Sequence, residues 1–123
     1  AEVFVADAAL LRIAVYDATS GEPVRALGAE GAAPGRFRAP FGVAVAEGCL
    51  VVSEGAGQRV QVLTLLGEPL QVLPLGGALR GLSWDAGSGR LAVAAFESHR
   101  VELLRASASK LRRLMRKCRV VAE

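Results

Sequence analysis

The residues of this sequence that could do chemistry are few and lie far apart. The chain has one histidine, His99, and two cysteines, Cys49 and Cys118. A general base needs an orienting partner, and a metal site needs several ligands at suitable spacing. Neither pattern surrounds these three residues, so the sequence predicts no catalytic residue, no metal site and no cofactor. Two cysteines are too few for a disulfide framework, and reading them as reduced thiols favours an intracellular location.

Three arginines recur at one position of an internal repeat: Arg12, Arg59 and Arg100. They could form a ring of cations for an acidic partner. The other interpretation is structural, with each guanidinium binding loop carbonyls of its own or the neighbouring repeat. We expect the structural role, because repeats seldom share one binding site identically.

Two acidic residues, Asp7 and Glu54, precede the first two arginines by the same spacing. They could line a ligand site near a central axis, or accept backbone N–H groups in the turn that follows. The third repeat has Ala95 at this position, which argues against a complete acidic ring. We therefore expect the turn role.

The repeat itself predicts the fold class. Residues 50–63 align with residues 3–16, and residues 91–104 continue the series, with spacings of 47 and 41 residues between the arginines. Within residues 35–73, four short apolar runs are separated by Gly, Pro or small polar residues, which is typical of antiparallel strands joined by turns. A period of about 40–45 residues with four strands indicates propeller blades. The prediction is an all-β partial β-propeller of four-stranded antiparallel blades, with a short C-terminal α-helix.

The second repeat resembles the NHL family, whose pattern is Gly-x-Phe-x-x-Pro-x-Gly-Val-Ala-Val, a strand ending in Asp or Glu, then Arg-Val-Gln-Val and Gly. The matching residues are, in order, Gly35, Phe37, Pro40, Gly42, Val43, Val45, Glu54, Arg59, Val60, Gln61, Val62 and Gly67. Residues 98–101 match the family's Asn-His-Arg segment with Ser in place of Asn. The resemblance covers about residues 2–105, and it makes His99 a structural residue of the repeat.

The blade boundaries follow from this alignment. We expect NHL-type blades over residues 1–106, divided into a partial blade (2–27), a full blade (36–73) and a partial blade (79–105). The first lacks an inner strand and the third lacks a recognisable outer strand. Gly42 and Gly81 are expected to be packing glycines where inner strands crowd together.

Charge is unevenly distributed along the chain. Six of the fifteen basic residues lie within residues 110–119, and the rest of the chain is nearly balanced. Leu111, Leu114, Met115 and Cys118 have the spacing of one helix face, so residues 107–123 are predicted to form a basic amphipathic helix. It could dock on the third blade, or bind nucleic acid, an anionic membrane surface or a calmodulin-like partner.

The resemblance implies a protein-interaction or scaffolding module rather than an enzyme, and a part of a larger propeller. The partner is expected to be a protein, further blades of the same or another chain, or a second copy in a homodimer. Candidate partner-binding residues are Arg36, Arg38, Lys110, Arg112, Arg113, Arg116 and Lys117. No apolar run is long enough to predict a transmembrane helix.

Two other functions remain open. Some NHL propellers bind RNA on a basic face, but the balanced charge of the repeats leaves only the tail for this role. Others resemble lyases or lactonases, which need metal ligands that converge on the central channel. The single histidine makes a remnant of such an enzyme the least supported alternative.

Overall fold

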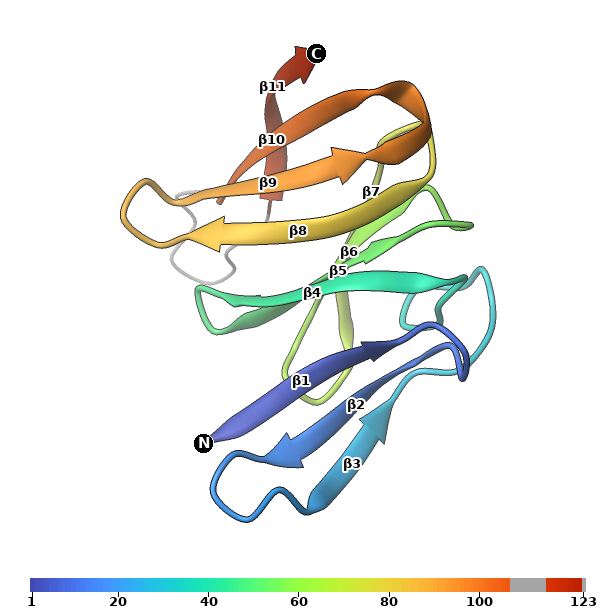
Figure 1. Ribbon diagram of the computed structural model, residues 1–123, viewed down its shortest axis with the longest axis vertical. Helices are drawn as coiled ribbons and strands as arrows, with labels where there is room; N and C mark the ends of the chain where they lie inside the picture. The colour runs from blue at the N-terminus through green and yellow to red at the C-terminus, as the bar shows by residue number, and fades with distance from the viewer. Residues whose placement is uncertain (107–114, 123) are drawn as a thin grey trace.

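The computed structural model describes residues 1–106 and 115–122, with side chains described for residues 1–105, as three antiparallel sheets that follow one another along the chain (Figure 1). The first sheet has the order β1-β2-β3, formed by β1 (Glu2–Asp7), β2 (Arg12–Asp17) and β3 (Pro23–Leu27). The second has the order β4-β5-β6-β7, formed by β4 (Pro40–Ala46), β5 (Cys49–Glu54), β6 (Arg59–Leu63) and β7 (Pro69–Pro74). The third has the order β11-β10-β9-β8, formed by β8 (Leu79–Asp85), β9 (Arg90–Ala95), β10 (Arg100–Ala106) and β11 (Met115–Ala122).

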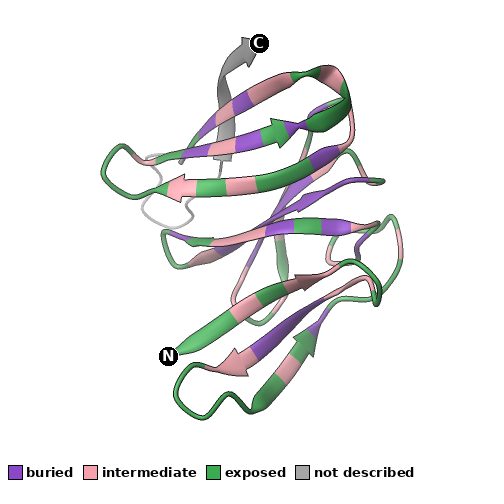
Figure 2. Cartoon of the chain, viewed as in Figure 1, coloured by how far each residue is buried: buried purple, intermediate pink, exposed green. Residues whose placement is uncertain are grey.

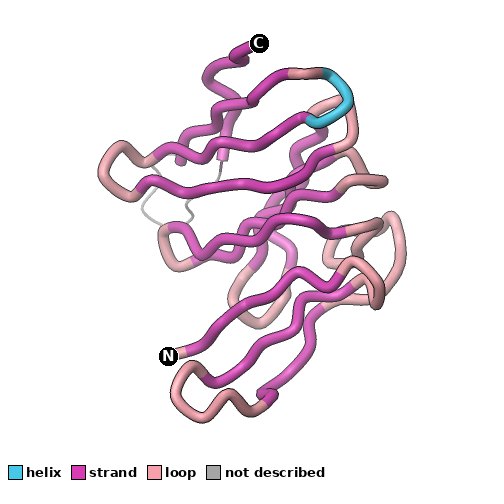
Figure 3. The backbone as a smooth tube through the Cα atoms, in the orientation of Figure 1, coloured by secondary structure: helices cyan, strands magenta, loops and turns pink. Residues whose placement is uncertain are grey.

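Short turns join neighbouring strands, as the sequence predicts (Figure 3). The Asp17 side chain accepts hydrogen bonds from the amides of Thr19 and Ser20, both at 2.8 Å. Asp85 accepts from the amide and the hydroxyl of Ser88 in the corresponding turn of the third sheet. These Asx-type bonds hold the chain reversals, because they satisfy turn amides that the strands do not pair. The only helical turn in the described part is the 3-10 segment η1 (Phe96–Ser98).

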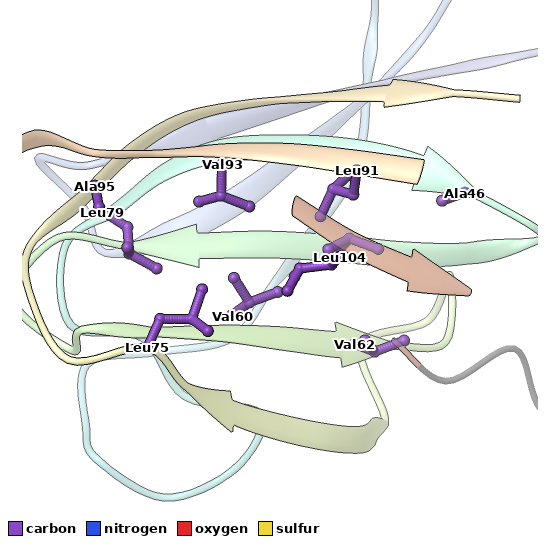
Figure 4. Close-up of a cluster of buried hydrophobic side chains, with 10 residues drawn as sticks. Ala46, Val60, Val62, Leu75, Leu79, Leu91, Val93, Ala95 and Leu104 are labelled. Atoms are coloured by element: carbon purple, nitrogen blue, oxygen red, sulfur yellow. The ribbon is translucent and has the colours of Figure 1, made fainter. Parts of the chain in front are cut away.

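The core lies between the sheets, in two clusters. The first joins sheets one and two and includes Ile13, Val15, Phe37, Leu50 and Val52. The second joins sheets two and three and includes Val60, Val62, Leu79, Leu91 and Val93 (Figure 4). Alternation along each strand sends successive side chains to opposite faces, so the second sheet contributes to both clusters. The core is therefore built mainly from Val and Leu.

The first sheet has an uncovered flank. Figure 2 shows exposed positions along β1 and β3, in contrast to the buried middle strands of the second sheet. β1 pairs with β2 and with no other described strand.

The C-terminal prediction was wrong over the part that the structure describes. Instead of a helix, residues Met115–Ala122 form β11, which pairs antiparallel with β10. The third sheet therefore has the outer strand that the sequence alignment lacked. A short helix is marginal unless its apolar face docks, whereas a strand here fills the open edge of β10 with a ladder of backbone hydrogen bonds. Leu111 and Leu114, on the predicted helix face, lie outside the described residues.

Candidate functional site

The three recurring arginines occupy the same cross-strand position in the three sheets. Arg12 lies opposite Asp7, Arg59 opposite Glu54, and Arg100 opposite Ala95. Each is the first residue of its strand, at the end of the molecule where the inner strands β4 and β8 also begin (Figure 1). The hydrogen bonds around each arginine show the role of this repeat position.

In the second sheet, Arg59 binds the segment that arrives from the first sheet. Its Nε donates to Oε2 of Glu54 at 2.6 Å, and its terminal nitrogens donate to the carbonyls of Ala32 at 2.6 Å and Arg36 at 3.0 Å. Glu54 is fully buried, and its Oε1 accepts from the amide of Arg38 at 2.7 Å. Gln61 completes the network by donating to Glu54 and to the Arg36 carbonyl. The network therefore holds the crossing segment, residues 28–39, against the start of β6.

In the third sheet, Arg100 does the same with different partners. Its terminal nitrogen donates to the carbonyls of Leu75 at 2.9 Å and Gly76 at 3.2 Å, in the crossing from the second sheet. Its carboxylate partner is Glu102, at 2.9 Å from its Nε. Glu102 occupies the position of Gln61, two residues after the arginine, which the sequence alignment did not single out. Arg59 and Arg100 thus each donate to carbonyls of the crossing that arrives from the preceding sheet.

In the first sheet, Arg12 lies near an acidic residue, but no described segment corresponds to the crossings that Arg59 and Arg100 bind. Its Nε lies 3.8 Å from Oδ2 of Asp7, beyond hydrogen-bond distance, and this buried nitrogen has no hydrogen-bond partner among the described residues. Asp7 accepts from the Leu10 amide at 3.0 Å, in the turn that follows β1.

The two expected packing glycines differ. A Cβ added at Gly42 would lie 2.7 Å from Oγ of Ser53 and 2.9 Å from the amide nitrogen of Leu82. Ser53 accepts from the Gly42 amide and donates to the carbonyl of Arg80, so it connects β4 with β8. At Gly81, which is exposed, an added Cβ would have no neighbour within 4 Å. A side chain is thus excluded by close neighbours at Gly42, whereas Gly81 has open space around it.

Sequence reasoning missed an arginine held between two phenylalanines. The guanidinium carbon of Arg80 lies 4.4 Å from the centre of the Phe41 ring and 4.5 Å from that of the Phe96 ring. Arg80 is exposed, and Phe41 and Phe96 are 42% and 57% exposed. The three come from β4, β8 and η1, so no local sequence pattern reveals the stack. The exposure of the two phenylalanines becomes visible only in the structure.

This stack lies at the same end of the strands as two of the predicted partner-binding residues. Arg36 and Arg38 are exposed and belong to the crossing that leads into β4. We call the exposed set Arg36, Arg38, Phe41, Arg80 and Phe96 the arginine–phenylalanine face. It combines three cations with two apolar rings.

The remaining predicted residues lie elsewhere. Lys110, Arg112 and Arg113 fall outside the described residues, and Arg116 and Lys117 lie on β11, where only the backbone is described. His99 is exposed and follows η1 in the left-handed conformation, with φ of 51°. It lines a cavity of about 250 Å³ together with Phe96, Arg100 and Val101.

Other candidate chemistry is sparse in the described part. Among residues 1–105, whose side chains the structure describes, no three His, Cys, Asp or Glu side chains gather where they could hold a metal ion. No helix of that part is long and apolar enough to cross a membrane. Cys49 is a partly buried thiol outside any disulfide.

Comparison with known proteins identifies the fold but no family. No protein-family profile and no curated protein matches the sequence. Among solved structures, the chain is similar to Kuenenia stuttgartiensis hydrazine synthase, with a TM-score of 0.72 and 14% identity over 95% of this chain and 31% of that one. It is also similar to U3-55K, with a TM-score of 0.74 and 15% identity over 99% of this chain and 36% of that one.

A third similar structure is a chain of the mitotic checkpoint complex, with a TM-score of 0.64 and 16% identity over 92% of this chain and 36% of that one. The chain thus spans about a third of the length of these structures. At such low identity the likeness concerns the fold alone. It is consistent with successive blades of a partial β-propeller, and the NHL family is not established by it.

Proposed function

We propose that this chain is part of an NHL-type β-propeller that serves as a protein-interaction or scaffolding module, and that the arginine–phenylalanine face contacts the protein partner. The observation that carries the proposal is the exposed stack of Arg80 between Phe41 and Phe96. Arginine and aromatic residues dominate the binding energy of protein interfaces. A guanidinium on an aromatic ring is weakly hydrated, so a partner can cover it at low desolvation cost.

The architecture supports the same role. The Arg59 network holds the crossing that carries Arg36 and Arg38. The Arg100 network holds the crossing that directly precedes Arg80. Residues presented on loops above a rigid scaffold are a common arrangement for binding. The proposal assigns no catalytic step to the chain, and the solved structures of similar fold include one named for a multiprotein complex.

RNA binding is the second candidate, since exposed arginines beside aromatic rings can also stack on nucleotide bases. The acidic residues Glu30 and Glu97 are exposed near the same loops, which disfavours a polyanion. The experiment below therefore also measures the affinity for single-stranded RNA.

The test places a photo-crosslinking phenylalanine analogue at position 96 and identifies the proteins captured in cells. We expect capture of a defined partner, with a loss of at least tenfold in the Arg80→Asp variant. The matched control is Arg90→Asp, an exposed strand-start arginine at the opposite end of the third sheet. Equal capture by both variants would contradict the proposal. A salt-dependent affinity for single-stranded RNA, lost only in Arg80→Asp, would favour the RNA alternative.

A further inference from the structure

The guanidinium of Arg80 is held in place but has no acceptor among the described residues. Three other arginines each donate to a carboxylate and to a backbone carbonyl: Arg25, Arg59 and Arg100. Arg80 instead contacts the rings of Phe41 and Phe96, and within residues 1–105 its side chain forms no hydrogen bond and no ion pair. Its N–H donors therefore remain for a ligand.

Two neighbouring sheets position this side chain. Arg80 is the second residue of β8, and its backbone carbonyl accepts from Oγ of Ser53 on β5. Phe41 is the second residue of β4, the inner strand beside β8 (Figure 1), and its ring packs so closely on Gly55 that an added Cβ there would lie 2.9 Å from Cε2. Phe96 begins η1, directly after β9. Because three anchored segments hold the stack, part of the cost of ordering it is met before a ligand binds.

The donors left on Arg80 fit a carboxylate. A guanidinium presents its N–H groups in a planar fork, and a carboxylate can accept two parallel hydrogen bonds from it. The phenyl rings beside the fork keep water away from it, and a lower local dielectric strengthens such bonds. Phe41 and Phe96 are 42% and 57% exposed, so the same rings can also contact an apolar residue next to the carboxylate.

The charges around the stack favour a single carboxylate over a polyanion. Arg36 and Arg38 are exposed in the crossing that leads into β4, so the face is cationic. Glu30 and Glu97 are exposed near the same loops, and neither forms an ion pair with Arg80. These two acids would repel a row of phosphates more strongly than one carboxylate. Complementary charge of this kind selects the partner and raises the rate of encounter.

We propose that Arg80 recognises an acidic segment of the protein partner. Its fork binds the side-chain carboxylate of one Asp or Glu, and the rings of Phe41 and Phe96 contact an apolar residue beside that acid. This inference rests on the proposed function, because it names the chemistry of the same partner. Both rings and the guanidinium come from the second and third sheets, so the described residues contain the whole site.

Four tripeptides with the same leucine flanks test this chemistry. The first is acetyl-Leu-Glu-Leu-amide, the second has Gln and the third phosphoserine in place of Glu, and the fourth is acetyl-Leu-Gln-Leu with a free C-terminus. Each is titrated into the isotope-labelled protein while the arginine Nε–Hε resonances are recorded. We expect the Glu peptide to shift the Arg80 resonance saturably. It should bind about tenfold more tightly than the Gln peptide and at least as tightly as the other two.

The variant that tests the fork is Arg80→Lys, which keeps the charge and also assigns the Arg80 resonance. It should weaken the Glu peptide about tenfold, because an ammonium group cannot form the two parallel bonds. The matched control is Arg90→Lys, at an exposed position at the other end of the third sheet, and its affinity should be unchanged. If Arg80→Lys unfolds, the peptide series on the parent protein still decides the question.

Equal affinities of the Glu and Gln peptides would overturn the inference, as would unchanged affinity in folded Arg80→Lys. Tighter binding of the phosphoserine peptide or of the free C-terminus would identify another ligand and would also overturn it. Partner capture at position 96 together with equal peptide affinities would leave the proposed function standing without this inference. Binding of the Glu peptide at Arg80 when no partner is captured would support the carboxylate site and contradict the proposed function.

Discussion

Arg100 and Glu102 lie two residues apart on β10 and pair at 2.9 Å, whereas Arg59 takes its carboxylate, Glu54, from the neighbouring strand at 2.6 Å. The arginine therefore occupies the same repeat position in both sheets, whereas its carboxylate partner comes from a different position in each. The crossing held by Arg59 covers residues 28–39, and Glu54 also accepts the Arg38 amide within it. The crossing held by Arg100 covers only residues 75–78, and Ala95 stands at the Glu54 position. What the second and third sheets share is a charge-paired guanidinium that binds the carbonyls of the incoming crossing.

Replacing Arg59 should be among the most damaging single changes in the described part of the chain. Arg59→Met leaves the buried Glu54 without its cation and releases the carbonyls of the crossing. Breaking a buried pair on one side costs about 3–5 kcal/mol of unfolding free energy. Urea denaturation measures this loss, with Arg90→Met as the exposed control. A loss below about 1 kcal/mol would show that the pair contributes no more than a surface ion pair.

Gly42 and Gly81 offer a matched pair at the inner strands. Gly42→Ala pushes a methyl group against the backbone nitrogen of Leu82, at 2.9 Å, and should cost about 1–3 kcal/mol through overpacking. Gly81→Ala meets no heavy atom within 4 Å and should leave stability unchanged or slightly raised, because alanine restricts the unfolded chain. Thermal melts of the two variants compare them directly. Equal effects would contradict the packing seen between β4 and β8.

The strand β11 predicts a proline pattern that a helix would not show. In an antiparallel pair, successive amides point alternately toward and away from the partner strand. Val120 and Val121 lie opposite Glu102 and Val101, so only one of their amides can bond to β10. Proline substitution should therefore be clearly worse at one of these two positions than at the other, by about 1 kcal/mol or more. Denaturation midpoints measure the difference, and equal tolerance would mean that β11 is not paired.

The turn at Asp85 should make stability depend on acidic pH. The hydroxyl and amide of Ser88 donate to this carboxylate and hold its pKa below the ordinary value of 3.8. A group whose pKa is lowered in the folded state stabilises the fold above its unfolded pKa, and that contribution disappears as pH falls through the folded pKa. Asp85→Asn should therefore lower the melting temperature at neutral pH, and the gap to the parent protein should close under strongly acidic conditions.

Melting curves recorded from about pH 7 down to about pH 2 check this expectation. Ser88→Ala, which removes one of the donors, should reproduce part of the loss and the same pH trend. Parallel curves for Asp85→Asn and the parent at every pH would show that the carboxylate charge contributes nothing to the turn.

The sequence by itself determined the strands β1 to β10, because alternating apolar residues and Gly, Pro or Asx turns act locally. It also determined the arginine position, since Arg12, Arg59 and Arg100 recur at the start of equivalent strands. These features depend on residues close together in the chain, so the repeat alignment was enough to find them.

Only the tertiary structure decided the features that depend on distant neighbours. The spacing of Met115 and Cys118 fits a helix, but the unpaired edge of β10 makes a strand the better hydrogen-bonded solution. The difference between Gly42 and Gly81 depends on Leu82 and Ser53, which no local pattern connects to them. The same holds for Arg80, whose two aromatic neighbours come from separate sheets, because a stack between blades exists only once the blades have packed.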